Sequence, residues 1–231
     1  MNKLIAGIPV YNDLKNFKEA INSFMKSTIS YDYIYIIESQ STDGTAEYCD
    51  KLHKKYPDKI FILKTPKLGP LHAYNEIFKQ AKKEKADLFL FQSDVTFPKC
   101  HNRDWLKEMQ DVSKLEECGI VTCYGGGGQS GPDFIDSFYW VGAWTTCIPY
   151  KTIKKIGGYD MNIPMGYGVD IDYSYAINQA GLKVYVINYW VDHHPDYRKN
   201  HQHEKVDNFK EIIDSAFIYM RKKWRLGEFK E

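Results

Sequence analysis

Short apolar runs alternate with segments of helical periodicity in the first part of the chain. The runs read as buried strands are LIAGIPV (4–10), YIYIIE (33–38), KIFILK (59–64) and DLFLFQ (87–92). Between the first two, Phe17, Ala20, Ile21 and Phe24 recur at helical spacing. This alternation predicts βαβ units, and therefore an α/β fold with a Rossmann-like, mostly parallel sheet flanked by helices.

Polar segments follow each predicted strand, at residues 9–12, 38–41, 69–75 and 92–94. In open parallel sheets, ligands bind in the crevice beyond the carboxyl ends of the strands. We therefore expect these four segments to meet at one edge of the sheet and to form a small-molecule site there.

The second half of the sequence is less regular. A helix around Trp105 and a strand GIVTCY (119–124) precede the Gly-rich segment 125–133, which we interpret as a mobile loop beside the site. Residues 138–150 are rich in β-branched and aromatic side chains. The segment GYGVDIDYSYAINQAG (166–181) predicts a helix with acidic residues in its first turn and Gly181 at its end.

The C-terminal segment has the pattern of an amphipathic helix. Its apolar stripe consists of Phe209, Ile212, Ile213, Ala216, Phe217 and Met220, followed by the basic run RKKWR. We interpret residues 1–203 as a single domain, with a nucleotide-binding half (1–98) and an acceptor half (99–203). Residues 204–231 would pack on this domain or lie at an interface, either in a homodimer or against an anionic membrane surface.

Composition and charge exclude several classes of protein. The chain has 231 residues, and 31 Lys and Arg against 30 Asp and Glu leave a net charge of +1, which recruits no nucleic acid. Its five cysteines form no CxxC pair, and no apolar run reaches the ~18 residues of a membrane span. We expect a cytoplasmic protein, soluble or peripherally associated with a membrane.

Five motifs occur in an order that resembles a known family. They are IPVYND (8–13), STDGT (41–45), SDVTFP (93–98), GGYD (157–160) and the GVDID helix (168–172) followed by Ala-Gly and a His pair. From about residue 4 to about residue 195, this arrangement resembles the inverting GT-A glycosyltransferases of family two. The resemblance implies transfer of a sugar from a nucleotide-sugar donor, with a UDP-sugar as the first choice, to an acceptor hydroxyl.

The resemblance also implies a set of donor-binding residues. Pro9, Tyr11 and Glu38 would line the base pocket, with Glu38 in place of the family's usual Asp. Many members place an Arg ahead of an Asn in the third crossover, near the phosphates. Here Tyr74 precedes Asn75, and His72 or Lys67 would supply the positive charge instead.

A divalent cation, Mn²⁺ or Mg²⁺, is implied as the cofactor on the diphosphate. Asp94 matches the second acid of the family's Asp-x-Asp, whereas Gln92 replaces the first, with Ser93 between them. A hard cation prefers oxygen ligands, and a neutral amide adds no charge, so we expect weaker metal binding than an Asp pair gives. His193 or His194 would complete the metal shell, although the pair is equally consistent with a turn packed on Trp190.

The family's general base is implied at Asp170, where Val169 replaces the family's Glu. An alcohol is a poor nucleophile at neutral pH, so a carboxylate must accept its proton during attack. Trp140 and Trp144 can form an acceptor platform by stacking on sugar rings.

Asp172 is a further candidate for acceptor binding, although an acid in a first helical turn also complements the helix dipole. The acceptor itself can be a carbohydrate, a lipid-linked intermediate or a protein. Two alternatives remain open, a sugar nucleotidyltransferase and a catalytically silent nucleotide-sugar-binding protein.

Overall fold

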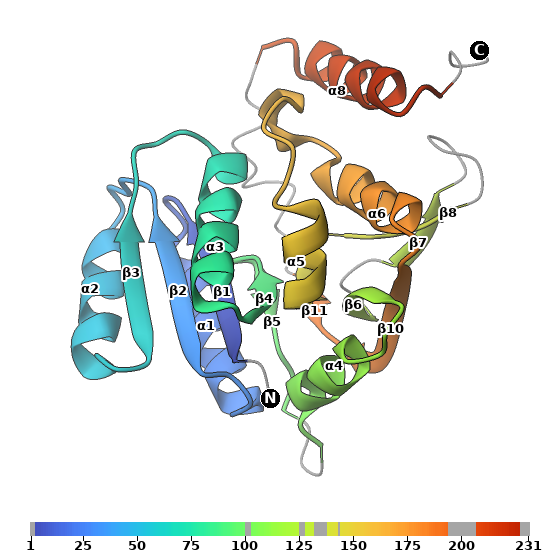
Figure 1. The fold of residues 1–231 in the computed structure, drawn as a ribbon. Coiled ribbons are helices and arrows are strands. Elements are labelled where there is room, and N and C mark those ends of the chain that lie inside the picture. The colour runs from blue at the N-terminus through green and yellow to red at the C-terminus, as the bar shows by residue number, and fades with distance from the viewer. Residues whose placement is uncertain are drawn as a thin grey trace.

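The computed structural model describes residues 3–99, 103–124, 128–131, 138–142, 144–193 and 207–226. Its centre is a seven-stranded sheet in the order β10-β6-β9-β4-β1-β2-β3 (Figure 1). The strands are β1 (Leu4–Val10), β2 (Tyr33–Glu38), β3 (Ile60–Lys64), β4 (Asp87–Phe91), β6 (Cys118–Tyr124), β9 (Thr145–Ile148) and β10 (Lys183–Trp190). The predicted strands of the first half are confirmed to within one residue at their ends.

Most neighbouring strands of this sheet run in parallel. Strand β1 pairs in parallel with β2 and β4, β2 pairs with β3, and β10 pairs with β6. Strand β9 lies antiparallel between β4 and β6. The prediction of a mostly parallel α/β sheet is therefore confirmed, with a reversed strand joining its two halves.

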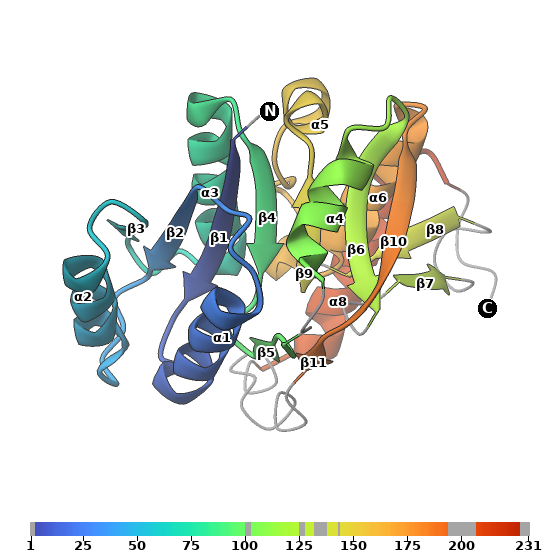
Figure 2. The ribbon, with the colours of Figure 1, turned by 90° about the horizontal axis from the view of Figure 1, so that it is seen from below.

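Helices cover both faces of the sheet (Figure 2). Helices α1 (Leu14–Ser27), α2 (Thr45–Lys55) and α4 (Trp105–Ser113) contribute to the hydrophobic core on one face. Helices α3 (Pro70–Glu84), α5 (Tyr150–Ile156) and α6 (Val169–Gln179) contribute to the core on the other. Successive β1 residues, such as Ile5 and Ala6, belong to opposite cores, as expected for a strand buried on both sides.

Two short ladders lie beside the main sheet. Strand β5 (Val95–Thr96) pairs with β11 (Asp192–His193), and β7 (Gly128–Gly131) pairs with β8 (Phe138–Val141). The loop interpretation of 125–133 is therefore wrong for residues 128–131. Cross-strand pairing with the aromatic segment 138–141 outweighs the low strand propensity of the glycines.

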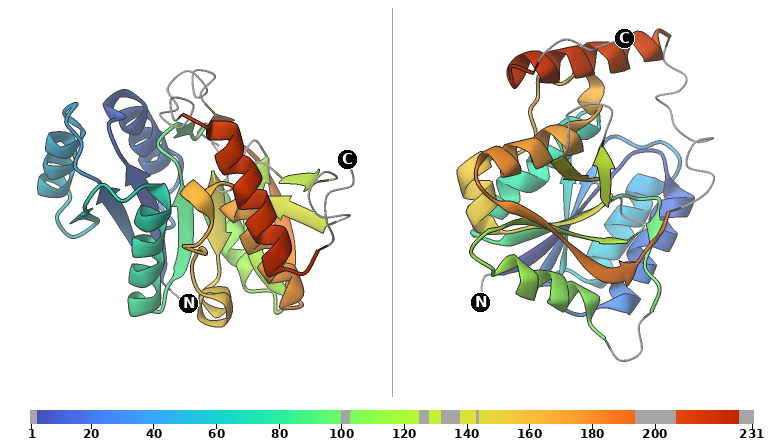
Figure 3. Two further views of the ribbon diagram at one scale, coloured as in Figure 1. Left: turned by 90° about the horizontal axis from the view of Figure 1, so that it is seen from above. Right: turned by 90° about the vertical axis from the view of Figure 1, so that its right-hand side faces the viewer.

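The C-terminal helix α8 (Phe209–Lys223) forms an outer layer over α6 and the 3-10 turn η1 (Pro164–Gly166) (Figure 3). The predicted apolar stripe faces the domain, since Ala216 and Met220 are fully buried. Ile218, on the opposite side of the helix, is exposed. The helix packs on the domain through this stripe, and the homodimer and membrane contacts proposed for the segment stay predictions.

An aromatic cluster around Phe24 fills the core between α1, α4 and the sheet. The Phe24 ring stacks on Phe91 with the centroids 4.7 Å apart and on Phe89 with the centroids 5.6 Å apart. It also meets Trp105 edge to face at 6.2 Å. Because Phe24 is completely buried, no smaller side chain can replace its contacts without leaving a cavity.

We expect Phe24→Ala to lower the free energy of unfolding by about 3–5 kcal/mol, because it removes buried apolar surface and leaves a cavity. Urea denaturation followed by far-UV circular dichroism measures this change. Ile218→Ala is the matched control, and at that exposed position the change stays within about 0.5 kcal/mol. Equal effects of the two substitutions would contradict the described core.

Candidate active site

The turns that follow β1 and β2 are bonded to each other. The backbone N–H of Asn12 donates to Ser41 Oγ at 3.0 Å, and Asn12 Oδ1 accepts the N–H of Thr42 at 2.7 Å. Glu38 Oε1 accepts the N–H of Ser41 at 2.6 Å. Asn12 and Gln40 both have a left-handed backbone, with φ of 47° and 61°. These bonds hold the ends of the two strands together at one edge of the sheet.

Asp43, in the STDGT motif, caps two helices at once. Its Oδ2 accepts the N–H of Leu14, the first residue of α1, at 2.9 Å, and its Oδ1 accepts the N–H of Thr45, the first residue of α2, at 3.1 Å. Burial works to raise the pKa of Asp43, but these bonds and that of the Thr45 hydroxyl outweigh it and lower the pKa. The charge also complements the positive ends of both helices.

Because Asp43 bonds the first N–H of α1, the Asp13 side chain does not cap this helix and contacts other residues of the candidate site. It occupies the cap position of α1 but makes no side-chain capping bond. Its carboxylate instead accepts the Ser93 hydroxyl at 2.6 Å and the Asn16 amide at 2.8 Å. Burial raises the pKa of Asp13, as do the charges of Asp94 and Asp43, against the lowering effect of the two hydrogen bonds. In the sequence, Asp13 stands out only as the last residue of the IPVYND motif.

The end of β4 presents Gln92, Ser93 and Asp94 in a turn beside Trp144. The Gln92 N–H donates to the Trp144 carbonyl at 3.2 Å, and Asp94 is 5% exposed. Strand β5 begins at the next residue, Val95, which is paired in register with His193 of β11. The backbone of one predicted metal ligand therefore lies close to Asp94. His194 and the side chain of His193 lie outside the described residues.

Tyr74, on α3, is within electrostatic range of the two acids that the sequence singled out. Its hydroxyl is buried, and burial raises its pKa well above the usual range. The Gln92 side chain hydrogen-bonds this hydroxyl and works to lower the pKa, whereas the charges of Asp94 and Asp170 both raise it. Asp94 and Asp170, which are far apart in the chain, thus both raise the pKa of the Tyr74 hydroxyl. Their effects indicate that both acids lie near it.

Asp170 is the second residue of α6, whose cap residue is Gly168. Gly168 has φ of +78°, a conformation that glycine adopts without strain. Asp170 is half-buried, and its Oδ1 accepts the N–H of Ile171 at 3.0 Å. Tyr159, from the GGYD motif, is also within electrostatic range of Asp170.

On the donor side, Lys67 and Tyr11 lie together. Lys67 Nζ is 4.4 Å from the centre of the Tyr11 ring, and this contact joins the segment after β3 to the segment after β1.

Two further predicted donor residues are His72 and Pro9. The Nε2 atom of His72 is 3.7 Å from Glu76 Oε1, and the buried Nδ1 atom of His72 has no hydrogen-bond partner within the described structure. Pro9 is paired in register with Ile37 of β2, beyond the last pairing of β1 with β4.

Several other predicted site residues have structural partners. The Asn75 amide donates to the carbonyl of Tyr159 at 3.0 Å and so links α3 to the GGYD motif. The buried Asp172 carboxylate accepts hydrogen bonds from Lys223 and Trp224, so a role for Asp172 in binding the acceptor substrate receives no support.

The backbone of Trp140 pairs with that of Gln129, and the Trp140 side chain lies outside the described residues. The ligand-binding roles of the predicted donor and acceptor residues stay predictions.

The described side chains fit a cation only if phosphate oxygens share in binding it. Within the described ranges, no group of three or more His, Cys, Asp or Glu residues is arranged to hold a metal ion. Mg²⁺ and similar cations on diphosphates, however, often take one or two protein carboxylates and complete their shell with phosphate and water. Asp94 can supply such a carboxylate. Burial is the main cause of the raised pKa of Asp13, and the charges of Asp94 and Asp43 add to it.

The sequence profile described as "Glycosyl transferase family 2" matches residues 6–163. The chain belongs to this family and is therefore a glycosyltransferase domain with the GT-A fold. No curated protein is significantly similar to it in sequence. Among the residues described, no helix has the length and hydrophobicity to cross a membrane.

Solved structures with the same fold include three glycosyltransferase complexes. Mannosyltransferase PcManGT from Pyrobaculum calidifontis, with GDP-Man and Mn²⁺, has a TM-score of 0.69 at 15% identity, over 99% of this chain and 66% of that one. GalNAc-T7 with UDP, GalNAc and Mn²⁺ has a TM-score of 0.66 at 14% identity, over 96% and 51%. TarS from S. aureus with UDP-GlcNAc has a TM-score of 0.61 at 14% identity, over 96% and 73%. The chain thus spans about half to three quarters of these solved chains, of which that of TarS is a fragment of residues 1–349.

We expect Asp43→Asn to lower the free energy of unfolding by about 0.3–1 kcal/mol at pH 7, because a charge at two helix N-termini is lost. The pKa of Asp43 is lowered in the folded state, so its stabilising effect is present above the unfolded value of about 3.9 and is lost as the pH falls through the folded value. Urea denaturation between pH 7 and pH 3 tests both points.

The stability difference between wild type and Asp43→Asn should shrink below about pH 4. Asp58→Asn, at an exposed position, is the control and should show no such trend. A difference for Asp43→Asn that stays constant over this range would contradict the capping assignment.

Proposed function

We propose that this domain transfers a sugar from a nucleotide-sugar donor to an acceptor hydroxyl with inversion at the anomeric carbon. Asp170 acts as the general base, and Asp94 holds a divalent cation on the diphosphate. The observation that carries this proposal is the position of Tyr74, whose buried hydroxyl is within electrostatic range of both Asp94 and Asp170. An inverting transfer needs these two functions at one cleft, on either side of the anomeric carbon.

The hydrogen bonds between the segments that follow β1 and β2 support a donor site at the same edge of the sheet as Asp94. Tyr11, with Lys67 over its ring, offers an aromatic face for the base and a cation for the phosphates. GDP-Man, UDP and UDP-GlcNAc in the structural neighbours support a nucleotide-sugar donor of this kind. A bound Mn²⁺ or Mg²⁺ would stabilise the charge that develops on the leaving diphosphate.

The first turn of α6 supports the acceptor side. The half-buried Asp170 carboxylate is close to the buried hydroxyl groups of Tyr74 and Tyr159. During attack, Asp170 would take the proton from the acceptor hydroxyl as its oxygen forms the new bond to the anomeric carbon. The Trp144 carbonyl, bonded to the Gln92 N–H, brings the predicted acceptor platform next to the β4 turn.

We expect Asp170→Asn to lower kcat by about 10²–10⁴-fold while donor affinity is unchanged, because only the proton acceptor is removed. The donor is first selected by thermal shift from a panel of UDP-, GDP- and dTDP-sugars with Mn²⁺. Release of nucleoside diphosphate, with water or a sugar as acceptor, then measures turnover. Asp58→Asn is the control for the same chemical change at an exposed site. Undiminished turnover in Asp170→Asn would remove Asp170 from its role.

We expect Asp94→Asn to abolish the stabilisation of donor binding by Mn²⁺, because the carboxylate that shares the cation with the diphosphate is lost. Thermal shift with UDP-sugar or GDP-sugar, in the presence of Mn²⁺ or EDTA, measures the effect. The variant should respond equally in both conditions, whereas wild type should respond more strongly with Mn²⁺. The metal role of Asp94 is ruled out if both proteins respond to Mn²⁺ alike.

A further inference from the structure

Helix α8 packs directly against the turn that carries Asp170 (Figures 1 and 3). Met220 is fully buried, and a Cβ atom placed on Gly168 would lie only 2.8 Å from Met220 Cε. Phe209, at the start of the helix, meets the Tyr167 ring edge to face at 5.4 Å. The outer helix is therefore in van der Waals contact with the residues that immediately precede Asp170.

At its C-terminal end, α8 binds two acids that flank Asp170 in the sequence. Lys223 Nζ lies 2.9 Å from Asp160 Oδ2 and 2.7 Å from Asp172 Oδ2. Trp224 Nε1 donates to Asp172 Oδ1 at 2.7 Å, and the Tyr219 hydroxyl donates to Asp160 Oδ2 at 2.9 Å. One ammonium group thus joins the GGYD motif to the first turn of α6.

These contacts are strong enough to fix the geometry of the turn. Asp172 is 4% exposed, and a buried carboxylate needs a charged or hydrogen-bonding partner. Burial works to raise the pKa of Asp160, but the Asn162 N–H, Lys223 and Tyr219 outweigh it and hold the pKa at about 2. Asp160 is therefore ionised at neutral pH, and the ion pair with Lys223 is maintained.

The two bridged segments both reach Asp170. Asp172 shares the first turn of α6 with it. Asp160 follows Tyr159, whose ring packs edge to face against Tyr173 at 5.3 Å and Tyr74 at 5.6 Å. Through these contacts, a movement of the GGYD motif would alter the surroundings of the Asp170 carboxylate.

We propose that Lys223 is a positioning residue for Asp170, and that it acts by bridging Asp160 and Asp172. The inference rests on the proposed role of Asp170 as the base. Lys223 lies on the outer helix, and none of its described contacts is with the β4 turn or the ends of β1 and β2, so we expect donor binding to be unchanged without it. What it controls is the direction in which the base faces the acceptor hydroxyl.

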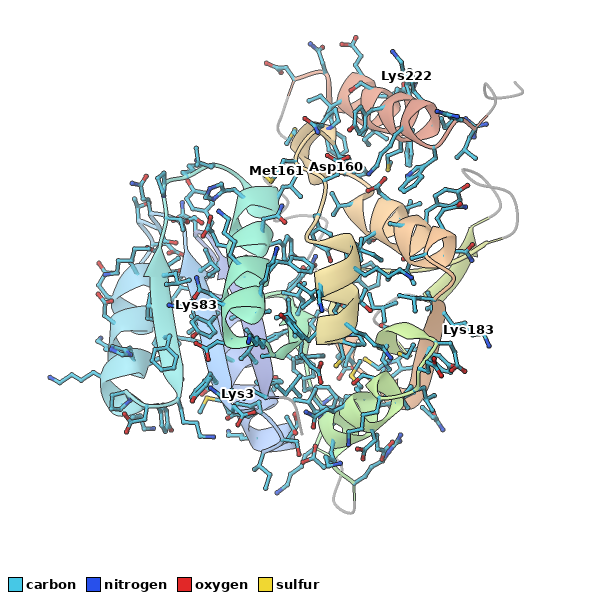
Figure 4. The ribbon with its side chains drawn as sticks, viewed as in Figure 1. Lys3, Lys83, Asp160, Met161, Lys183 and Lys222 are labelled. Atoms are coloured by element: carbon cyan, nitrogen blue, oxygen red, sulfur yellow. The ribbon has the colours of Figure 1, made fainter. Side chains whose placement is uncertain are left out.

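The test compares Lys223→Met, Lys223→Arg and Lys222→Met. Lys222, the preceding residue on α8, is exposed and points away from Asp160 (Figure 4). We expect Lys223→Met to lower kcat for release of nucleoside diphosphate by about 10–100-fold with the KM for the donor unchanged, because a misdirected base slows the chemical step alone. Lys223→Arg should recover most of kcat, and Lys222→Met should resemble wild type.

If Lys223→Met does not fold, a double variant still tests the proposal. Lys223→Met combined with Asp172→Asn removes the buried charge together with its partner, so it should remain folded and still show the low kcat. Wild-type kcat in either folded variant, or equal changes in kcat and KM, would overturn the proposal. Loss of activity in Asp170→Asn together with full activity in Lys223→Met would reject this inference alone, whereas full activity in Asp170→Asn would reject the proposed function.

Discussion

The parallel pairing of β1 with both of its neighbours is the constraint on which the site depends. Because β2 and β4 both run in the direction of β1, the segments that follow all three strands emerge at one edge of the sheet. Ser93, after β4, therefore reaches Asp13, after β1, and Asn12 reaches Ser41, after β2. If one of these strands were reversed, the segment that follows it would emerge at the opposite edge, a strand length away from the other two.

Capping chemistry determines which acids at this edge remain available. Asp43 provides the hydrogen-bond acceptor for the first N–H groups of both α1 and α2. Asp13 can then accept the Ser93 hydroxyl, and its pKa is raised by burial and by the charges of Asp94 and Asp43. Carboxylates that look alike in the sequence thus have different partners, with Asp43 at the starts of two helices and Asp13 at Ser93. Asp13 and Asp94 are thus acids at one edge of the sheet, and the charge of Asp94 affects the pKa of Asp13.

The sequence was sufficient to predict the sheet of the first half and the edge at which the segments after β1, β2 and β4 meet, because both follow from local periodicity and chain direction. The same periodicity placed Asp170 in the first turn of a helix. Local patterns could not predict β7 and β8, since glycines in 128–131 become a strand only through pairing with 138–141. Local patterns also could not decide whether Asp172 binds the acceptor or has a structural role in the helix, because its partners Lys223 and Trp224 come from a distant segment.

The order of the segments along the chain affects how the molecule assembles during synthesis. Strand β10 completes the seven-stranded sheet, and α8 follows it in sequence. Synthesis runs from the N-terminus, so Asp172 is made before Lys223 and Trp224 and its carboxylate stays hydrated until they follow. Burial of this carboxylate must wait until Lys223 and Trp224 arrive. Completion of the α6 surface is therefore a late step, driven by a helix that adds no strand to the sheet.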